Sequence, residues 1–404
     1  MKKLWLGLLV IQALVNLVGA LGPELGFDAL WYHLTEAKLF RHTGSVAPIP
    51  GNLFYWSGFP RLMEIIYALT PAKLVHFGFG LSSAWMVYRL GGVAAAVLFY
   101  STLLVGWLST TAYVDLSLTF FILAAIATRR YWRKIIWLAL AGATKLTAIP
   151  ISFIITGFPW AMLGAIPFWL INWRSTGNPF YPFGTPAAPV GEWFYGGFWF
   201  WLSRPVRLFF DPAFRVGPII LILYLLSSTK RYSAGASSAY TLVASSLFLV
   251  WFLGPGTDTG RFALPLLALL SVSAAGVKSR IATTLILIHA LIGIFGRSYA
   301  NAKYLPVLLG QQPQSAFLTQ HLNFDFGDFY DTDGWFKQNI KPTDKVLVYD
   351  IHNLYYVDFP FDHESWAKPG TYYTHILSHH SKSLPLIYTN STTGVKVYLC
   401  YCYY

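Results

Sequence analysis

Apolar segments long enough to cross a bilayer recur along this chain and constrain its fold more than any other feature. The first runs from Leu4 to Leu21, another begins near Asp115, and the others cover about 72–88, 91–108, 217–228, 236–253, 262–277 and 281–296. About 20 apolar residues suffice for a membrane-spanning helix. Only 11% of the residues are charged, against roughly a quarter in soluble domains. The sequence therefore predicts an all-α polytopic membrane domain.

The positions of the charges predict how these segments are oriented. Basic clusters lie at 2–3, 129–134, 230–231 and 278–280, and none of them contains an acid. Because Lys and Arg are enriched in cytoplasmic loops, we predict a cytoplasmic N-terminus and an outer location for the acids of the membrane part. The basic excess lies between apolar segments, so it indicates membrane topology and not nucleic-acid binding.

The connections between the apolar segments are uneven in length. Two outer loops are predicted, at 23–70 and 175–216. The segment 135–173 contains three prolines and must begin inside and end outside for the other orientations to hold. It allows one long crossing with a buried hairpin, or three short crossings. We therefore expect nine to eleven crossings in total.

The first outer loop carries a predicted amphipathic helix. Apolar residues recur at helical spacing from Ala29 to Phe40, with Glu36 and Lys38 off the apolar face. A second short amphipathic helix is expected after Pro60. Such helices lie in the interface plane and do not cross the membrane.

A change in composition near residue 297 predicts a domain boundary. Residues 1–297 hold 22 Lys and Arg against 8 Asp and Glu, whereas residues 298–404 hold 7 against 9. In the second part, Lys345–Ile351 and Val395–Tyr404 alternate like strands, and 333–340 has a helix pattern. We predict a transmembrane domain over 1–297 and a small extracytoplasmic α/β domain over 298–404.

Two carboxylates at the outer edge of the bilayer are the strongest candidates for chemistry. Asp28 follows the first span, and Asp115 opens a later one; Glu64 is a third candidate. Charged groups are costly at membrane depth and are usually kept there for function. One carboxylate can act as a general base, and another can orient a substrate or hold a divalent metal. The alternative for Asp28 is a cap on the helix that begins at Ala29.

Two cations are candidates for binding an anion near the same edge. Lys145 is the only charge in its apolar stretch, and Arg261 lies between two spans. A guanidinium can bind phosphate through two parallel hydrogen bonds. Arg174 and Arg61 are weaker candidates, and a local pair with Asp258 is the alternative for Arg261. The sequence contains no nucleotide-binding motif of the Walker or GxGxxG type.

Several motifs together resemble those of bacterial GT-C glycosyltransferases, membrane enzymes that use polyprenyl-phosphate sugars on the outer face. DALWYHL at 28–34 is similar to the first-loop acidic motif, and TAYVDLSLTFF at 111–121 to the second. Two further stretches, PRLME at 60–64 and NPFYPF at 178–183, resemble other motifs of the family. Lys145, which follows Thr144, resembles the family's buried lysine, and Arg261 resembles a late arginine motif.

The resemblance implies a GT-C fold and an inverting transfer of a sugar from a polyprenyl phosphate in the bilayer to an extracytoplasmic glycan, lipid or protein. It implies Asp28 as the base and Asp115 as the residue that orients the donor or a metal. The implied substrate-binding residues are Lys145, Arg261, Arg174, Glu64, Arg61, Tyr32 and His33. Two alternatives are a transporter or flippase of an amphipathic lipid, and an inactive assembly factor.

Overall fold

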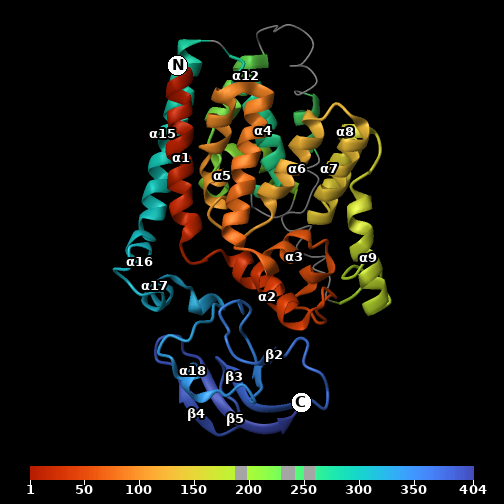
Figure 1. The fold of residues 1–404 in the computed structure, drawn as a ribbon, viewed down its shortest axis with the longest axis vertical. Helices are drawn as coiled ribbons and strands as arrows, with labels where there is room; N and C mark the ends of the chain where they lie inside the picture. The colour runs from red at the N-terminus through yellow and green to blue at the C-terminus, as the bar shows by residue number, and fades with distance from the viewer. Residues whose placement is uncertain (187–197, 229–241, 250–259, 278) are drawn as a thin grey trace.

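The computed structural model describes residues 1–186, 198–228, 242–249, 260–277 and 279–404. Helices form the larger part, and a small sheet built from the end of the chain lies below it in Figure 1. The two short helices of the first outer loop, α2 and α3, lie between these parts. This arrangement agrees with the predicted helical membrane domain followed by a small α/β unit.

Three helices of the described residues are long and apolar enough to cross a membrane. They are α1 (Lys2–Leu21), α4 (Ala72–Tyr100) and α15 (Arg280–Ala302). Shorter apolar helices cover Asp115–Ala127 and Gly260–Ala274. The predicted total of nine to eleven crossings therefore stays a prediction.

The chain between residues 72 and 108 is interrupted close to where the prediction placed a break, near residue 90. The helix α4 consists of two helical pieces that meet at a non-helical residue, Gly92, and the second piece ends at Tyr100. Within α4 the backbone kinks at Gly92, whose φ of +83° is left-handed and is unfavourable for residues with a Cβ. A separate short helix, α5 (Leu103–Leu108), follows. The glycine therefore determines the position of the kink.

Three short helices occupy the segment 135–173, and none is among the described helices that are long and apolar enough to cross a membrane, so both alternatives for this segment stay predictions. The three helices are α7 (Tyr131–Thr144), α8 (Ala148–Thr156) and α9 (Met162–Thr176). Trp160 donates a hydrogen bond to the Tyr131 hydroxyl at 2.8 Å, so the start of α7 and the connection from α8 to α9 lie at the same end. The three helices therefore run back and forth.

The remaining helices complete the membrane part and the loops. The predicted span at 236–253 lies partly outside the described residues, although 242–249 are helical. The other elements are η1 (Ala29–His33), α2 (Leu34–Thr43), η2 (Tyr55–Gly58), α3 (Leu62–Leu69), α6 (Asp115–Ala127), α11 (Phe198–Phe210), η3 (Pro212–Phe214), α12 (Ile219–Ser228), η4 (Gly260–Ala263) and α14 (Leu264–Ala274). Thus η1, a π-helix, and α2 form the predicted first helix of the outer loop, and α3 forms the second.

The C-terminal unit contains a mixed five-stranded sheet in the order β2-β1-β3-β5-β4. The strands are β1 (Val346–Val348), β2 (Phe361–His363), β3 (Tyr372–Ser378), β4 (Leu386–Thr389) and β5 (Lys396–Tyr403). The β1 strand pairs in parallel with β2 and β3, whereas β5 pairs antiparallel with β3 and β4. Both predicted strands, β1 and β5, are present.

Short helices connect the membrane part to this sheet. They are α16 (Leu305–Leu308), α17 (Gln314–His321), η5 (Phe324–Phe326) and α18 (Trp335–Asn339). The last of the membrane helices, α15, continues to Ala302, five residues past the predicted boundary. Phe336 of α18 packs into the sheet core with Val346, Val348 and Leu377. The same hydrophobic core includes Phe54 of the first outer loop, so the sheet and that loop share it.

The first outer loop touches the sheet at Gly51. This residue has a φ of +91°, and a Cβ there would overlap the carbonyl of Ser365. Gly51→Ala should therefore destabilise the protein by about 1–3 kcal/mol, measured as a lower melting temperature. Gly44 is the matched control, because its φ of +65° is also left-handed but an added Cβ would have no atom within 4 Å. Equal losses for Gly51→Ala and Gly44→Ala would show that the contact contributes nothing.

The orientation of the chain is a separate prediction. Ser315 of α17 is exposed and belongs to the connection to the sheet, whereas Ser279 precedes α15 at the opposite end of that helix. In a variant without Cys400 and Cys402, an impermeant thiol reagent should label a cysteine at position 315 in intact cells. A cysteine at position 279 should be protected, because its basic neighbours favour the cytoplasm. Equal protection at both positions would overturn the assignment.

Candidate functional site

Four charged side chains of alternating sign meet at one end of the membrane helices. The Arg261 guanidinium lies 2.5 Å from Asp28 Oδ2 and 3.8 Å from Asp115 Oδ2. The Lys145 ammonium lies 2.7 Å from Asp115 Oδ1. The structure thus brings both predicted carboxylates and both predicted cations together, in the order Asp28, Arg261, Asp115, Lys145.

Each of the four is positioned by the end of a helix. Asp28 directly precedes η1, and Asp115 is the first residue of α6, where a negative charge is favoured by the helix dipole. Lys145 directly follows α7, and Arg261 belongs to the short helix η4 before α14. The ends of apolar helices gather at one membrane boundary, so these residues meet although they are far apart in sequence.

The four charges are largely removed from water. Asp115 has 2% of its side chain exposed, Arg261 12%, Asp28 14% and Lys145 22%. Arg261 also lies over the ring of Tyr113 at 4.9 Å, and Lys145 over Phe262 at 4.0 Å. Buried charges are tolerated only with partners. The alternating order supplies each charge with an opposite neighbour.

Asp28 does not cap the helix that follows it. Its side chain makes no capping hydrogen bond to η1. Instead, Oδ2 accepts a hydrogen bond from the Tyr32 hydroxyl at 3.0 Å and pairs with Arg261. Burial and the Asp28 carboxylate raise the pKa of Tyr32 well above its usual value, so Tyr32 remains a donor. Both contacts use Oδ2, and Oδ1 takes part in neither.

A second polar group lies beside these four. His33 Nδ1 is 2.5 Å from Glu64 Oε1, and both side chains are buried. Arg61 is also buried, donates to Asn172 Oδ1 at 3.3 Å, and lies over the Phe168 ring at 5.5 Å. Glu64 is therefore held by a histidine, and the Arg61 guanidinium is anchored to α9.

One predicted site residue lies elsewhere. Arg174 is exposed in the last turn of α9 and does not line the cavity described below. Two residues earlier, the buried Asn172 faces inward and contacts Arg61 and the carbonyls of Gly58 and Tyr181. The proposed alternative partner of Arg261, Asp258, lies outside the described residues.

A cavity of about 230 Å³ connects the two polar groups. It is lined by Asp28, Lys145 and Arg261 at one group and by His33, Arg61 and Glu64 at the other. Its remaining walls are mainly aromatic: Trp31, Tyr32, Tyr55, Trp56, Phe59 and Phe262. Apolar walls with a few converging polar groups are typical of ligand sites. We call this the charged cavity.

The donor atoms of these residues are a poor match for a metal ion. Among the residues that the structure describes, no group of three or more His, Cys, Asp or Glu is arranged to hold a metal. Asp28 and Asp115 each pair with a cation, and Glu64 pairs with His33. These side chains do not fit a metal site, so no step of the mechanism below uses one.

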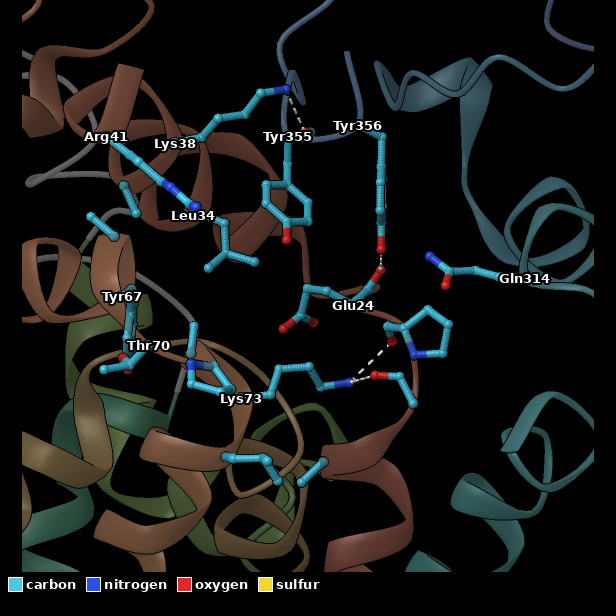
Figure 2. Close-up of a pocket in the computed structure, with 18 of the residues that line it drawn as sticks. Glu24, Leu34, Lys38, Arg41, Tyr67, Thr70, Lys73, Gln314, Tyr355 and Tyr356 are labelled. Atoms are coloured by element: carbon cyan, nitrogen blue, oxygen red, sulfur yellow. Dashed lines mark hydrogen bonds between the residues drawn. The ribbon is translucent and has the colours of Figure 1, made fainter. Parts of the chain in front are cut away.

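A second, larger cavity of about 1020 Å³ lies between the membrane part and the C-terminal unit, and Figure 2 shows it. Lys38 donates to the carbonyls of Tyr355 and Val357, and Lys73 donates to the carbonyls of Gly22 and Pro23. Lys38 and Lys73, two cations that line this cavity, are therefore bound to backbone carbonyls. We call this the junction cavity.

The helix formed by η1 and α2 separates the two cavities. Leu34, Ala37, Lys38 and Arg41 line the junction cavity, at spacings of three, one and three residues. Tyr32, His33 and Glu36 line the charged cavity on the other side. Glu36 was not among the predicted site residues, although it follows Tyr32 by four residues and thus shares its helix face.

Comparisons with known proteins identify the fold. No family model matches the sequence, and no curated protein is similar enough in sequence to count as a match. Two solved structures match at the level of fold. They are ArnT from Cupriavidus metallidurans bound to undecaprenyl phosphate, with a TM-score of 0.62 and 12% identity, and the same protein in the apo state, with 0.57 and 11%. Each alignment covers 98% of both chains.

The chain has the ArnT fold. ArnT is a GT-C glycosyltransferase, so the GT-C fold predicted from the motifs is confirmed. The match extends over the C-terminal unit as well as the membrane helices, since 98% of the chain is aligned. With the three long apolar helices, the ArnT fold identifies an integral membrane protein. At 11–12% identity the likeness concerns the fold alone.

Proposed function

We propose that this protein transfers a sugar from a polyprenyl phosphate to an extracytoplasmic acceptor, with inversion at the anomeric carbon. The observation that supports this most strongly is the chain of charges Asp28, Arg261, Asp115 and Lys145 at the ends of the membrane helices. Asp28, Arg261 and Lys145 line the charged cavity, and Asp115 lies behind the two cations. The ArnT fold supports the donor class, because a solved ArnT binds undecaprenyl phosphate.

Asp28 is the proposed general base. As the acceptor hydroxyl oxygen attacks the anomeric carbon, a carboxylate oxygen of Asp28 takes the hydroxyl proton. Oδ1 suits this step because the Arg261 and Tyr32 contacts both use Oδ2. These two contacts fix the orientation of the carboxylate, which favours a productive geometry.

Lys145 and Arg261 are the proposed phosphate ligands. The bond from the anomeric carbon to the phosphate oxygen breaks with its electron pair remaining on that oxygen, so negative charge grows on the phosphate. Two cations in a largely dry cavity stabilise this charge. Asp115 touches both cations, at 2.7 and 3.8 Å, and is the proposed residue that holds them in place.

The location of the cavity suggests how the substrates reach it. A polyprenyl donor keeps its chain in the bilayer, and the charged cavity lies at the ends of the apolar helices α6, α7 and α14. The acceptor is an extracytoplasmic glycan, lipid or protein that presents a hydroxyl group. Nucleic acid is not an expected partner.

The test uses the purified protein in lipid nanodiscs with a panel of polyprenyl-phosphate sugars and extracted envelope acceptors. We expect the sugar to appear on an acceptor and polyprenyl phosphate to be released in equal amounts. A panel without any transfer would overturn the proposal. Movement of the intact lipid across vesicle membranes, again without transfer, would instead identify a flippase.

A further inference from the structure

Three buried polar atoms at one end of the charged cavity lack a partner. Within the described parts of the chain, Glu36 Oε1, Glu64 Oε2 and Arg61 Nε accept or donate no hydrogen bond. All three residues line the cavity. A buried polar group without a partner has lost its hydrogen bonds to water and makes none within the protein, which destabilises the folded state. These atoms therefore indicate a ligand that supplies the missing hydrogen bonds.

Of these three residues, Glu36 is the one that the sequence analysis did not identify as a candidate site residue. It is 1% exposed and lies on α2, which packs against the helix α3 that carries Glu64. Burial and the neighbouring Glu64 carboxylate hold the pKa of Glu36 well above its usual range, although Arg61 opposes the shift. A carboxyl group that retains its proton can both donate and accept a hydrogen bond.

The charges of the cavity are divided between its two polar groups. Lys145 and Arg261 are at one, whereas Glu36 and Glu64 are at the other with Arg61. A phosphate is attracted to the two cations of the first group and repelled by the Glu64 carboxylate of the second. A neutral group with several hydroxyls suits the second, because it can donate to Glu36 and Glu64 and accept from Arg61.

The aromatic walls of the charged cavity fit the rest of such a group. Trp31, Tyr55, Trp56 and Phe59 line the same cavity, and Trp56 stacks on Tyr32 with centroids 5.4 Å apart. Sugar rings have apolar C–H faces between their hydroxyls, and aromatic side chains offer large apolar surfaces with a fixed geometry. A sugar is thus complementary to both the polar and the apolar surfaces.

We propose that Glu36 binds a hydroxyl group of the transferred sugar and so determines which sugar-bearing lipids the cavity accepts. This inference rests on the proposed function, because it places the sugar of the same donor. Glu36 recognises the sugar, whereas Lys145 and Arg261 recognise the phosphate. Glu36 should therefore contribute to the binding of a glycosylated polyprenyl phosphate and not to the binding of polyprenyl phosphate alone.

The test compares the affinities of two lipids for the protein in nanodiscs. One is polyprenyl phosphate, and the other is the polyprenyl-phosphate sugar that wild type binds best. Glu36→Met should weaken binding of the sugar-bearing lipid about 10-fold to 100-fold, the range expected for one lost buried hydrogen bond, and leave polyprenyl phosphate unchanged. Glu36→Gln should retain most of the preference, because an amide also donates and accepts. Arg41→Met, on the junction-cavity face of the same helix, should change neither affinity.

The outcomes separate this inference from the proposed function. Loss of affinity for both lipids in Glu36→Gln and Glu36→Met would make Glu36 structural and overturn the inference, while the transferase proposal stands. Unchanged affinity for the sugar-bearing lipid in Glu36→Met would also overturn it and would leave ordered water as the partner of Glu36. If wild type binds neither lipid, both the inference and the proposed function fail.

Discussion

Replacing Asp28 by asparagine is expected to slow sugar transfer by about 100-fold to 10,000-fold, the usual contribution of a general base. Asparagine keeps the size of the side chain but cannot take the acceptor proton. A base is needed only as the bond forms, so turnover falls and donor binding does not. Donor binding should even tighten, because Arg261 loses an anion that competes with phosphate. The measurement is the single-turnover rate at saturating donor, with donor affinity measured separately.

The fold of the Asp28→Asn variant should remain intact. Asp28 makes no helix cap, and Arg261 keeps Asp115 at 3.8 Å. Expression and melting temperature should therefore be close to wild type. Asp358→Asn is the control, because Asp358 lines the junction cavity, away from the proposed chemistry, and the variant should retain full turnover. If Asp28→Asn turns over normally, Asp28 is not the base, and Glu64 is the next residue to test.

Replacing Lys145 by glutamine is expected to weaken donor binding by about 1.5–3 kcal/mol, the usual contribution of a hydrogen bond to a charged group. That corresponds to roughly 10-fold to 150-fold in affinity. The change also removes the 2.7 Å partner of Asp115, a carboxylate with only 2% of its side chain exposed. The melting temperature should fall as well, because Asp115 is left with the more distant Arg261, at 3.8 Å, as its cation, and losing the close partner of a buried charge is destabilising.

A double variant separates the two effects of Lys145. Asp115→Asn added to Lys145→Gln removes the buried charge that has lost its close partner, so the melting temperature should recover, while Arg261 keeps Asp28. Donor affinity should remain low, because the cation that binds phosphate is still absent. Recovery of affinity together with stability would mean that Lys145 acts only through Asp115. Unchanged affinity in Lys145→Gln and Arg261→Gln would rule out the phosphate role for both residues.

The four charges that meet were all among the candidate residues named from the sequence, together with Arg174, which lies elsewhere. Asp28, Asp115, Lys145 and Arg261 each adjoin an apolar segment, and the ends of such segments are confined to a membrane boundary. Charge is also rare in this chain, so few combinations were available. The pairing itself was not predicted: Asp28 was weighed as a helix cap and Arg261 as a local partner of Asp258. Contacts between distant segments depend on how the helices pack, and the residue pattern of a single helix carries no information about that packing.

Glu36 shows where sequence reasoning fails most clearly. The periodicity of Ala29–Phe40 places it off the apolar face, and such a position usually faces water. In the structure it is 1% exposed, because the helix lies between α3 on one side and the C-terminal unit on the other. An amphipathic pattern identifies the apolar face of a helix but does not reveal that the polar face is covered too.

The C-terminal unit was predicted in part for a similar reason. The strand pattern of β1 and β5 was visible because the two segments are rich in Val and Tyr, residues that favour strands. The strands β2 and β4 are three and four residues long and mostly half-buried or exposed, so their pattern is weak. The order β2-β1-β3-β5-β4 depends on long-range pairing. A linear pattern of residues carries little information about such pairing.

The position of the helix formed by η1 and α2 affects both cavities. This helix is one continuous element with the charged cavity on one side and the junction cavity on the other. A shift of this helix away from one cavity is a shift toward the other. Lys38 ties the same helix to the Tyr355 and Val357 carbonyls, two residues after Glu36. The C-terminal unit is therefore hydrogen-bonded to the helix that carries the proposed sugar ligand, so the placement of that unit helps to fix the width of the charged cavity.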